Sequence, residues 1–554
     1  DDVVGYDSET TGLNPWDSDL ATMQFYGDKT GTLGLVKTPN GEIPTVVKEL
    51  LERPGKEFVA HNGVGFDLHF LSLAGVDINK AKWYDTLVGE AAINVSGRRD
   101  ITKNLKDSVR RRLGMEVNKS LQKSSWSADE LTPEQIVYAL EDVLHLPALR
   151  RAQVQRAEET EMLEGLLLEM ELVVPTAWLT INGIPLSVEK LAEYRAKQET
   201  VLKAADADYK ATFGEIRPTQ YQKLTQWFVD NGVDVLNTQK ETLQDLSLLG
   251  GKAAGYADLI LLCRPAMKRR DTYDEDWVAE HVRHGRIHPK FWQCGTDTTR
   301  YASSNPNGEQ VPRDMRYVFG WEDGNSVVAL DYSQIEIRVA ATIAQDEALM
   351  AVLDSEDVHT AMASLIFGAP EKEITFDQRK MAKAGSFTLL FGGGTQKFYD
   401  YARRGGGQLT EEEAQRFVNT FFSRFEGLAT LKQRAIEKTR QKRAITVRIP
   451  TGLKRVLVGQ KVRPTVLLNT MVQSTAAAGI KFAILEAHRR GLVAHYLGNQ
   501  VHDELVATVP VPQAEEYALE LAECMLLGMN RASRCRPRVE VKRVDGRIPE
   551  YWLK

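Results

Sequence analysis

The stretch from Val327 to Arg338 reads VVALDYSQIEIR and changes abruptly from apolar to polar. Its first four residues are apolar, which is typical of a short strand buried on both faces. Asp331 follows directly, and a buried strand that ends in an aspartate commonly presents its carboxylate at a cleft. The stretch therefore predicts a β-strand that delivers Asp331 to a functional site.

A second pair of acids stands far downstream, in the segment QVHDEL that begins at Gln500. The apolar runs on either side predict a hairpin with Asp503 and Glu504 in its turn. Adjacent carboxylates repel each other unless a cation lies between them, so a divalent metal ion is one interpretation. An exposed acidic turn is the other, and spacing alone leaves both open.

Between these acids lies a predicted helix with the sequence QRKMAKAGSFTLLFGGG. Arg379, Lys383, Phe387 and Phe391 recur every four residues and so share one face. The cations suit a polyphosphate, and the aromatic rings suit a stacked base. An aromatic stripe alone more often belongs to a core, but arginine and lysine are seldom buried without partners. The stripe therefore predicts a nucleotide-binding face.

The N-terminal part of the chain carries another group of acids. Asp7 and Glu9 point to one side of a predicted strand, because they are two residues apart. Asp67 ends the segment HNGVGFD, and Tyr138 and Asp142 lie one turn apart on a predicted helix. If they converge, these side chains suit two hard cations about 3.5 to 4 Å apart that hydrolyse a phosphodiester. Each acid taken singly is more often a helix cap or a surface residue.

In this order, DxET, HNxxxFD and YxxxD resemble the three motifs of proofreading 3′-5′ exonucleases of the DEDDy type. The resemblance covers nearly all of residues 1 to 150. It implies that Asp7, Glu9, Asp67 and Asp142 are metal ligands. It also implies that the tyrosine of the third motif orients the attacking water.

The two later acid segments and the cationic helix resemble the three polymerase motifs of A-family DNA polymerases. This group contains the large fragment of bacterial DNA polymerase I and many phage replicases. Gly295 to Asn307 is similar to the family's TxTGRxSSxxPN segment near the primer-template. Asn469 and Gln473 resemble the asparagine and glutamine that contact the duplex minor groove. The resemblance thus extends over the whole chain.

The resemblance implies a role for each matching residue of the polymerase centre. Asp331, Asp503 and the carbonyl of Tyr332 hold two Mg²⁺ ions, with Mn²⁺ able to substitute, and Glu504 supports the edge of the site. Lys383 grips the triphosphate and protonates the pyrophosphate. The further implied contacts are Arg379, His359, Gln334, Glu336, Phe387 and Phe391 for the nucleotide, and Arg300, Asn469, Gln473 and His502 for the primer-template. Among these, Glu336 is the residue that excludes a 2′ hydroxyl.

Four positions depart from the family pattern. Phe391 stands where bacterial enzymes usually carry tyrosine, and Thr388 and Thr299 each replace a usual glycine. Thr465 stands where an arginine is expected. We expect catalysis to survive these changes. Placement of the template base is the property that we expect them to affect most.

Length and composition predict a multidomain globular chain of the α/β and α+β classes. Its 554 residues are too many for a single hydrophobic core. Hydrophobic residues make up 43% and charged residues 26%, which are ordinary values for globular proteins. The net charge of −6 counts weakly against a nucleic-acid partner. Basic residues nevertheless cluster at 98–112, 264–270 and 438–443, where each run is either part of a DNA-binding surface or a solvated helix face.

The predicted architecture is a ribonuclease H-like 3′-5′ exonuclease domain followed by a right-hand polymerase domain. The predicted bounds are 1–155 for the exonuclease and 156–554 for the polymerase, with the thumb at about 187–264, the fingers at about 345–465 and the palm in the remainder.

Cellular context follows from what the chain contains. Four scattered cysteines and the absence of a long apolar run or a signal peptide predict a cytoplasmic protein with no membrane partner. We expect a monomer whose partners are primer-template DNA and deoxynucleoside triphosphates, and a processivity partner is left open.

Three other functions compete with this interpretation. A nuclease with a degenerate polymerase half would have lost Asp331, Asp503 or Lys383, and all three remain. A single-subunit RNA polymerase has no need of Glu336 or of an exonuclease domain. A noncatalytic accessory subunit would not keep both groups of acids.

Overall fold

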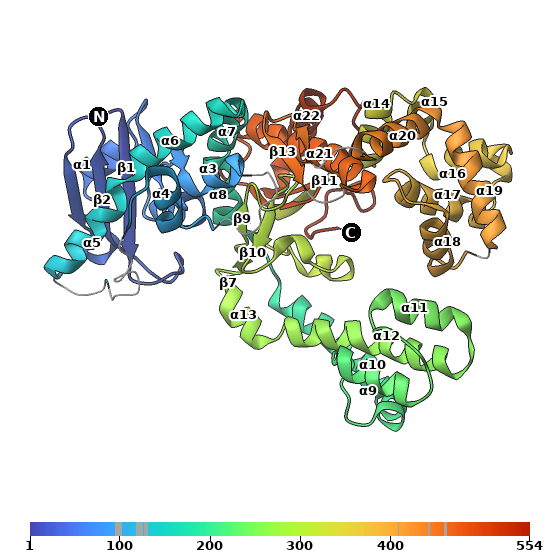
Figure 1. The fold of residues 1–554 in the computed structure, drawn as a ribbon. Helices are drawn as coiled ribbons and strands as arrows, with labels where there is room; N and C mark the ends of the chain where they lie inside the picture. The colour runs from blue at the N-terminus through green and yellow to red at the C-terminus, as the bar shows by residue number, and fades with distance from the viewer. Residues whose placement is uncertain are drawn as a thin grey trace.

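The computed structural model describes residues 1–94, 102–117, 126, 131–407, 409–440, 444–458 and 462–553, without the side chain of Phe387. In Figure 1 the predicted exonuclease domain lies to the left of the predicted palm, the predicted fingers lie to the right and the predicted thumb lies below. Within the described ranges, no helix is both long enough and apolar enough to cross a membrane.

The exonuclease domain is built on a five-stranded sheet in the order β3-β2-β1-β4-β5. β1 pairs antiparallel with β2 and parallel with β4, so the sheet is mixed. The strands are β1 (Val3–Thr10), β2 (Leu20–Gly27), β3 (Leu33–Lys37), β4 (Glu57–Ala60) and β5 (Lys82–Asp85). The helices are α1 (Thr45–Leu51), α2 (Asp67–Leu73), α3 (Thr86–Ile93), α4 (Leu105–Leu113), α5 (Pro133–Leu144) and α6 (Leu146–Glu159). α5 packs against β1 and β2, which brings a later part of the chain over the first strand.

Two helices connect the exonuclease domain to the palm. α7 (Leu163–Glu171) packs against α3 and β5, and α8 (Val173–Asn182) packs against both α2 and β14. Glu169 of α7 and Lys481 of the palm form an ion pair, and both side chains are fully buried. Breaking a buried pair by removing one partner is costly, so this contact ties the two halves together. The predicted boundary at residue 155 falls inside α6.

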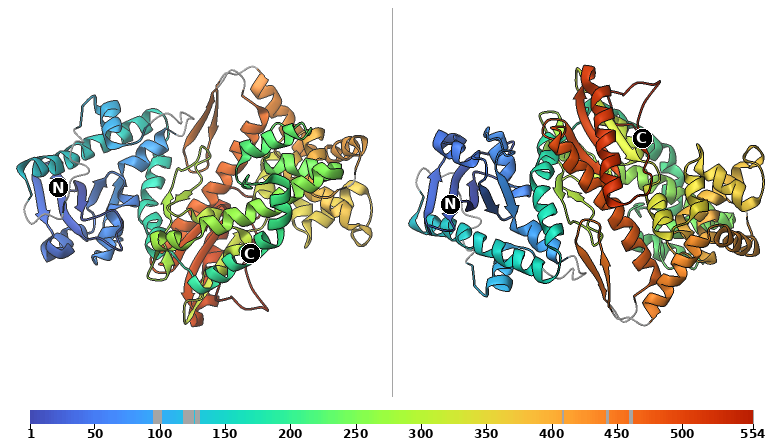
Figure 2. Two further views of the ribbon diagram at one scale, coloured as in Figure 1. Left: turned by 90° about the horizontal axis from the view of Figure 1, so that it is seen from below. Right: turned by 90° about the horizontal axis from the view of Figure 1, so that it is seen from above.

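The palm sheet has four strands in the order β14-β15-β11-β16, and every neighbouring pair is antiparallel. β11 (Asn325–Tyr332) contains the predicted strand, which is confirmed. The hairpin is confirmed too, but Glu504 begins its second strand and lies outside the turn. The other palm elements are β14 (Leu497–Val501), β15 (Glu504–Pro510), β16 (Val539–Val541), α21 (Pro464–Arg489) and α22 (Ala514–Ala532). α22 packs on β11 and β16, and α21 runs along α22 (Figure 2).

Four helices form the thumb around an aromatic core that includes Phe213, Trp227 and Phe228. They are α9 (Val188–Phe213), α10 (Tyr221–Asp230), α11 (Lys240–Leu249) and α12 (Gly251–Thr272). α12 therefore continues beyond the expected end of the thumb at residue 264. α13 (Glu275–His281) and short strands β6 (Ile184–Pro185), β7 (Val282–Arg283), β8 (Arg286–Ile287), β9 (Lys290–Trp292) and β10 (Ala302–Ser304) join the thumb to the palm.

α14 (Ile335–Ala344) leads from the palm into the predicted fingers. Their helices are α15 (Glu347–Leu353), α16 (Val358–Phe367), α17 (Phe376–Leu389), α18 (Thr395–Arg404), α19 (Glu411–Arg424) and α20 (Glu426–Arg440). The hairpin of β12 (Ala444–Arg448) and β13 (Lys454–Val458) follows them. The fingers reach the thumb, because Arg404 of α18 donates to both carboxylate oxygens of Asp245 on α11 at 2.8 and 2.6 Å. The two helices lie next to each other in Figure 1.

The basic clusters do not form one uniform surface. Arg264 is buried in the thumb, where its guanidinium donates to the carbonyl of Pro218 at 2.6 Å. Arg269 and Arg270 pair with Asp314 and Glu199 at 3.0 and 2.9 Å. Three arginines of the cluster at 264–270 are thus engaged with other groups of the protein, whereas Lys268 is exposed. A DNA-binding role for this run stays a prediction. Residues 98–101 and 441–443 of the other clusters lie outside the described residues.

Candidate functional site

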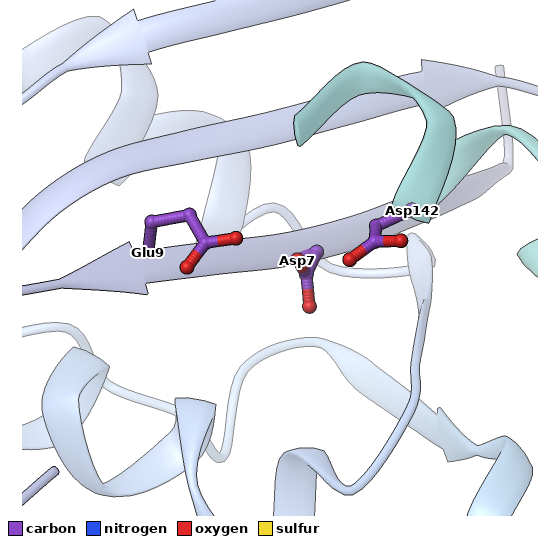
Figure 3. A group of neighbouring side chains, drawn as sticks. All are labelled: Asp7, Glu9 and Asp142. Atoms are coloured by element: carbon purple, nitrogen blue, oxygen red, sulfur yellow. The ribbon is translucent and has the colours of Figure 1, made fainter. Parts of the chain in front are cut away.

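Three of the predicted exonuclease acids come together at one place. Asp7 and Glu9 extend from the same side of β1, and Asp142 comes from α5, which lies across that strand (Figure 3). One carboxylate oxygen from each lies within 4.8 Å of the others. The two-residue strand period and the packing of α5 are what bring them together. Such a group of carboxylates is the donor set that hard divalent cations prefer.

Asp67 and Tyr138 are the other two residues predicted for the exonuclease centre, and neither belongs to this group of three carboxylates. Asp67 begins α2 and is buried, and its Oδ1 accepts a hydrogen bond from the Ser8 hydroxyl at 2.6 Å. Burial, with the charge of Asp85 adding to it, raises the pKa of Asp67 to about 7. Burial and the charge of Asp142 likewise raise the pKa of Tyr138, which keeps its hydroxyl protonated. That Asp67 binds metal stays a prediction.

The polymerase acids meet across the palm sheet. Asp331 is near the end of β11, opposite Glu504 in the antiparallel register, and Asp503 lies in the turn beside it. The backbone N–H of Tyr332 donates to the carbonyl of Asp503 at 3.2 Å. Burial raises the pKa of Asp503 to about 7, and the charge of Asp331 contributes. The two carboxylates therefore interact, and a divalent cation would relieve their repulsion.

Buried contacts fix the strands that carry these acids. The Trp552 indole donates to Glu504 Oε1 at 2.9 Å, and Arg316 forms an ion pair with the same carboxylate at 2.9 Å. Glu504 is thus engaged at the base of the hairpin, consistent with a supporting position. The Tyr332 hydroxyl donates to the carbonyl of Met525 on α22, which anchors the end of β11.

One cation at this site was missed in the sequence. The ammonium of Lys542, just after β16, lies 2.9 Å from Asp331 Oδ1. Lys542 belongs to no motif, and its neighbours in the sequence carry no signal that would relate it to Asp331. The pairing of β16 with β11 creates the contact.

The predicted nucleotide-binding cations meet on the fingers. Arg379 on α17 donates to both oxygens of Asp357 at 2.8 and 3.2 Å, and Asp357 caps α16 by accepting from the backbone N–H of His359. Burial lowers the pKa of His359 to about 4, and the charges of Lys383 and Arg379 contribute. The three predicted contacts are thus neighbours, with Lys383 exposed. Asp357 was not anticipated as a partner.

The aromatic end of the stripe departs from the prediction. α17 ends at Leu389, so Phe391 lies beyond the helix and packs, half-buried, against the main hydrophobic core. The helix stops because Gly392 takes a left-handed conformation with φ +79°. The side chain of Phe387 lies outside the described residues, so its contact with a nucleotide stays a prediction.

The remaining predicted contacts lie around the palm. Arg300 and Glu336 form an ion pair with each other. Gln334 precedes α14 in a left-handed conformation with φ 52°, and His502 occupies the hairpin turn with φ 56°. Asn469 and Gln473 are half-buried, one turn apart on α21. These placements leave the DNA-binding roles of Arg300, Asn469, Gln473 and His502 as predictions.

Comparison with known proteins identifies the family. Residues 189–547 match the family model described as DNA polymerase family A. The chain belongs to DNA polymerase family A. Residues 1–152 match the family described as 3′-5′ exonuclease. Membership makes the chain a DNA-directed DNA polymerase with a 3′-5′ exonuclease domain, dependent on divalent metal ions. It excludes the single-subunit RNA polymerase.

Curated relatives agree with this family A assignment, and a solved structure shares the fold. DNA polymerase I of Aquifex aeolicus is 29% identical over 99% of this chain and 95% of the relative. DNA polymerase I of Chloroflexus aurantiacus is 27% identical over 94% of this chain, which spans 59% of that relative's length. The POL domain of Pol1 from M. smegmatis, in complex with DNA primer-template and dNTP, has a TM-score of 0.82 at 21% identity, covering 99% of this chain and 95% of that chain. This likeness confirms the predicted fold.

Proposed function

We propose that the protein extends a primer 3′ end by template-directed addition of deoxynucleotides and excises 3′-terminal nucleotides at a second centre. The observation that carries this is the presence of two groups of carboxylates, one on β1 and α5 and one on the palm sheet. The family A structural relative was solved with primer-template and dNTP, which supports the same partners for this chain. One chain contains both centres, so a monomer suffices, and the bacterial DNA polymerase I relatives support a cytoplasmic location.

In the polymerase centre, Asp331 and Asp503 would hold Mg²⁺, or Mn²⁺ in its place, and the Tyr332 carbonyl would assist. Bound divalent cations supply activation of the primer hydroxyl and neutralisation of the triphosphate. Lys383 is exposed on α17 and available to donate a proton to the leaving pyrophosphate. Arg379 would exchange its carboxylate partner Asp357 for phosphate oxygens, which offer the same bidentate geometry.

In the exonuclease centre, Asp7, Glu9 and Asp142 would hold the cations, and Asp67 would join them on exchange of its hydrogen bond with Ser8. Tyr138 keeps its proton and therefore orients water as a hydrogen-bond partner. Each centre is proposed to take two Mg²⁺ ions, as carboxylate groups that cleave or form phosphodiesters commonly do.

The experiment is a primer-extension assay in Mg²⁺, run with all four deoxynucleotides and then with none. We expect extension in the first case, shortening from the 3′ end in the second, and neither when a chelator is present. Shortening from the 5′ end, or extension without a template, would contradict the proposal. Products labelled at the 5′ end of the primer distinguish these outcomes on one gel.

A further inference from the structure

Lys542 is placed next to Asp331 by strand pairing. In the register of β16 on β11, Val541 is opposite Leu330 and Glu540 is opposite Asp331. The backbone N–H of Lys542 then donates to the carbonyl of Ala329 at 2.9 Å, so the pairing continues through this residue. The main chain of Lys542 is therefore held against the strand that carries the catalytic carboxylate.

The side chain of Lys542 forms two contacts with acids. Its ammonium lies 2.9 Å from Asp331 Oδ1 and 3.3 Å from Glu540 Oε2. The side chain is 21% exposed, and that of Asp331 is 30% exposed, so water screens the pair only in part. Among the described residues, no other cation forms an ion pair with Asp331, so this ammonium compensates the carboxylate that lies beside Asp503.

Other cations around the palm and fingers are engaged with acids of their own. Arg300 pairs with Glu336. Arg316 pairs with Glu504 at 2.9 Å, and Arg379 with Asp357 at 2.8 Å. Lys542 is the cation that the described residues place on Asp331.

We propose that Lys542 is a positioning residue of the polymerase centre that holds Asp331 until a divalent cation binds and then gives way to that cation. This rests on the proposed function, in which Asp331 is a metal ligand. An ammonium and a divalent cation repel each other when both lie against one carboxylate oxygen. Binding of the cation therefore includes breaking the pair of Lys542 with Asp331. The lysine orients the carboxylate and sets the concentration of cation that the centre needs.

The test measures Mn²⁺ binding directly, by electron paramagnetic resonance of the free ion. The full chain carries Asp7→Ala and Glu9→Ala throughout, so that the polymerase centre dominates the signal. Lys542→Met removes the charge and keeps the length of the side chain, and we expect Mn²⁺ to bind about fivefold more tightly, the equivalent of one partly exposed ion pair. Lys542→Arg keeps the charge and should bind Mn²⁺ as the parent does.

A matched control is available at the next residue. Arg543 pairs with Glu515 at 2.7 Å and has no part in either centre. Arg543→Gln therefore removes one positive charge from the same segment, and Mn²⁺ affinity should not change. Lys542→Gln serves as a second neutral variant if Lys542→Met does not fold, as judged by circular dichroism.

Each outcome decides the matter. Equal Mn²⁺ affinity in Lys542→Met and in the parent would overturn the proposal. Weaker Mn²⁺ binding by Lys542→Met would also overturn it, because the lysine would then stabilise the metal-bound centre. Asp503→Ala in the same background tests the centre itself. Unchanged binding there would refute the proposed metal site. Lost binding there, together with no effect of Lys542→Met, would refute the role of Lys542 alone.

Discussion

The exonuclease and polymerase centres both present carboxylates from strands, but they differ in how far they are assembled. In the exonuclease domain, one sheet and one helix bring three acids within 4.8 Å of one another. In the polymerase domain, the acids lie on the palm and the predicted nucleotide-binding cations lie on the fingers, where Arg379 is engaged with Asp357. In the proposed mechanism, the polymerase centre is therefore completed only when the fingers contribute Arg379, which must exchange Asp357 for the substrate.

This difference has a physical origin in the two substrates. An exonuclease acts on a phosphodiester backbone, which carries one negative charge at each linkage. A polymerase must also bind a triphosphate, whose charge requires several cations that would repel one another while the site is empty. Pairing Arg379 with Asp357 would keep one of these proposed triphosphate-binding cations neutralised until the substrate arrives.

The largest expected effect separates the two centres. Asp503→Ala should lower the extension rate by about 10³-fold or more, because metal-ion stabilisation of a transition state is worth several kcal/mol. Degradation of single-stranded DNA by the same variant should be unchanged. Asp7→Ala with Glu9→Ala should have the reverse effect. Loss of both activities in either folded variant would show that the centres are one functional unit and would end the comparison.

Lys383 tests the claim that the polymerase centre depends on the fingers. Lys383→Ala should slow single-turnover nucleotide addition by about 10²-fold, the lower end of what general acid catalysis contributes. Lys383→Arg should recover nucleotide affinity more than rate, because a guanidinium is a poor proton donor. Lys380→Ala, on the same helix, is the matched control and should add nucleotides normally. Near-native addition by Lys383→Ala would remove the lysine from the catalytic residues.

Glu336 tests how the polymerase centre selects the sugar of the incoming nucleotide. Glu336→Ala opens space beside the nucleotide and frees Arg300, and we expect the ratio of ribonucleotide to deoxynucleotide addition to rise about tenfold. Glu336→Gln keeps the volume and loses the charge, so it should exclude ribonucleotides nearly as well as the native protein. The ratio is measured as kcat/KM for each nucleotide on one template. A similar rise in both variants would indicate that charge, rather than volume, is the barrier.

The smallest effect concerns protonation of Asp503, whose pKa of about 7 lies above the ordinary 3.8. A carboxyl with a raised pKa binds more protons in the folded state, so without metal it destabilises the protein progressively as pH rises from 3.8 to about 7. In a chelator at pH 8, Asp503→Asn should therefore be more stable than the native protein by about 1 kcal/mol. The difference should shrink at pH 5 and vanish only below about pH 3.8, the ordinary pKa of the group. Denaturant unfolding at both pH values measures it, and parallel pH profiles would contradict it.

Local patterns in the sequence were enough to predict the positions that chemistry requires. A strand places Asp7 and Glu9 on one side, and a helix places Tyr138 and Asp142 on one face, because both periods are properties of the backbone alone. The apolar run of β11 and the hairpin around Asp503 follow from the same kind of signal. Together with the family resemblance, these features predict the fold and the two groups of acids from the sequence alone.

Only the tertiary structure decided which charges face those acids. Lys542 reaches Asp331 through the pairing of two strands, and Arg404 reaches Asp245 where the fingers meet the thumb. Ser8 lies between Asp7 and Glu9 on β1, but its hydrogen bond to Asp67 depends on where the fold places the start of α2. These contacts join residues that are far apart in the chain. The periodicity of a strand or helix shows which side chains share a face, but it does not show which distant residue each of them contacts. Packing selects those partners, because burial of apolar faces fixes where each strand and helix lies.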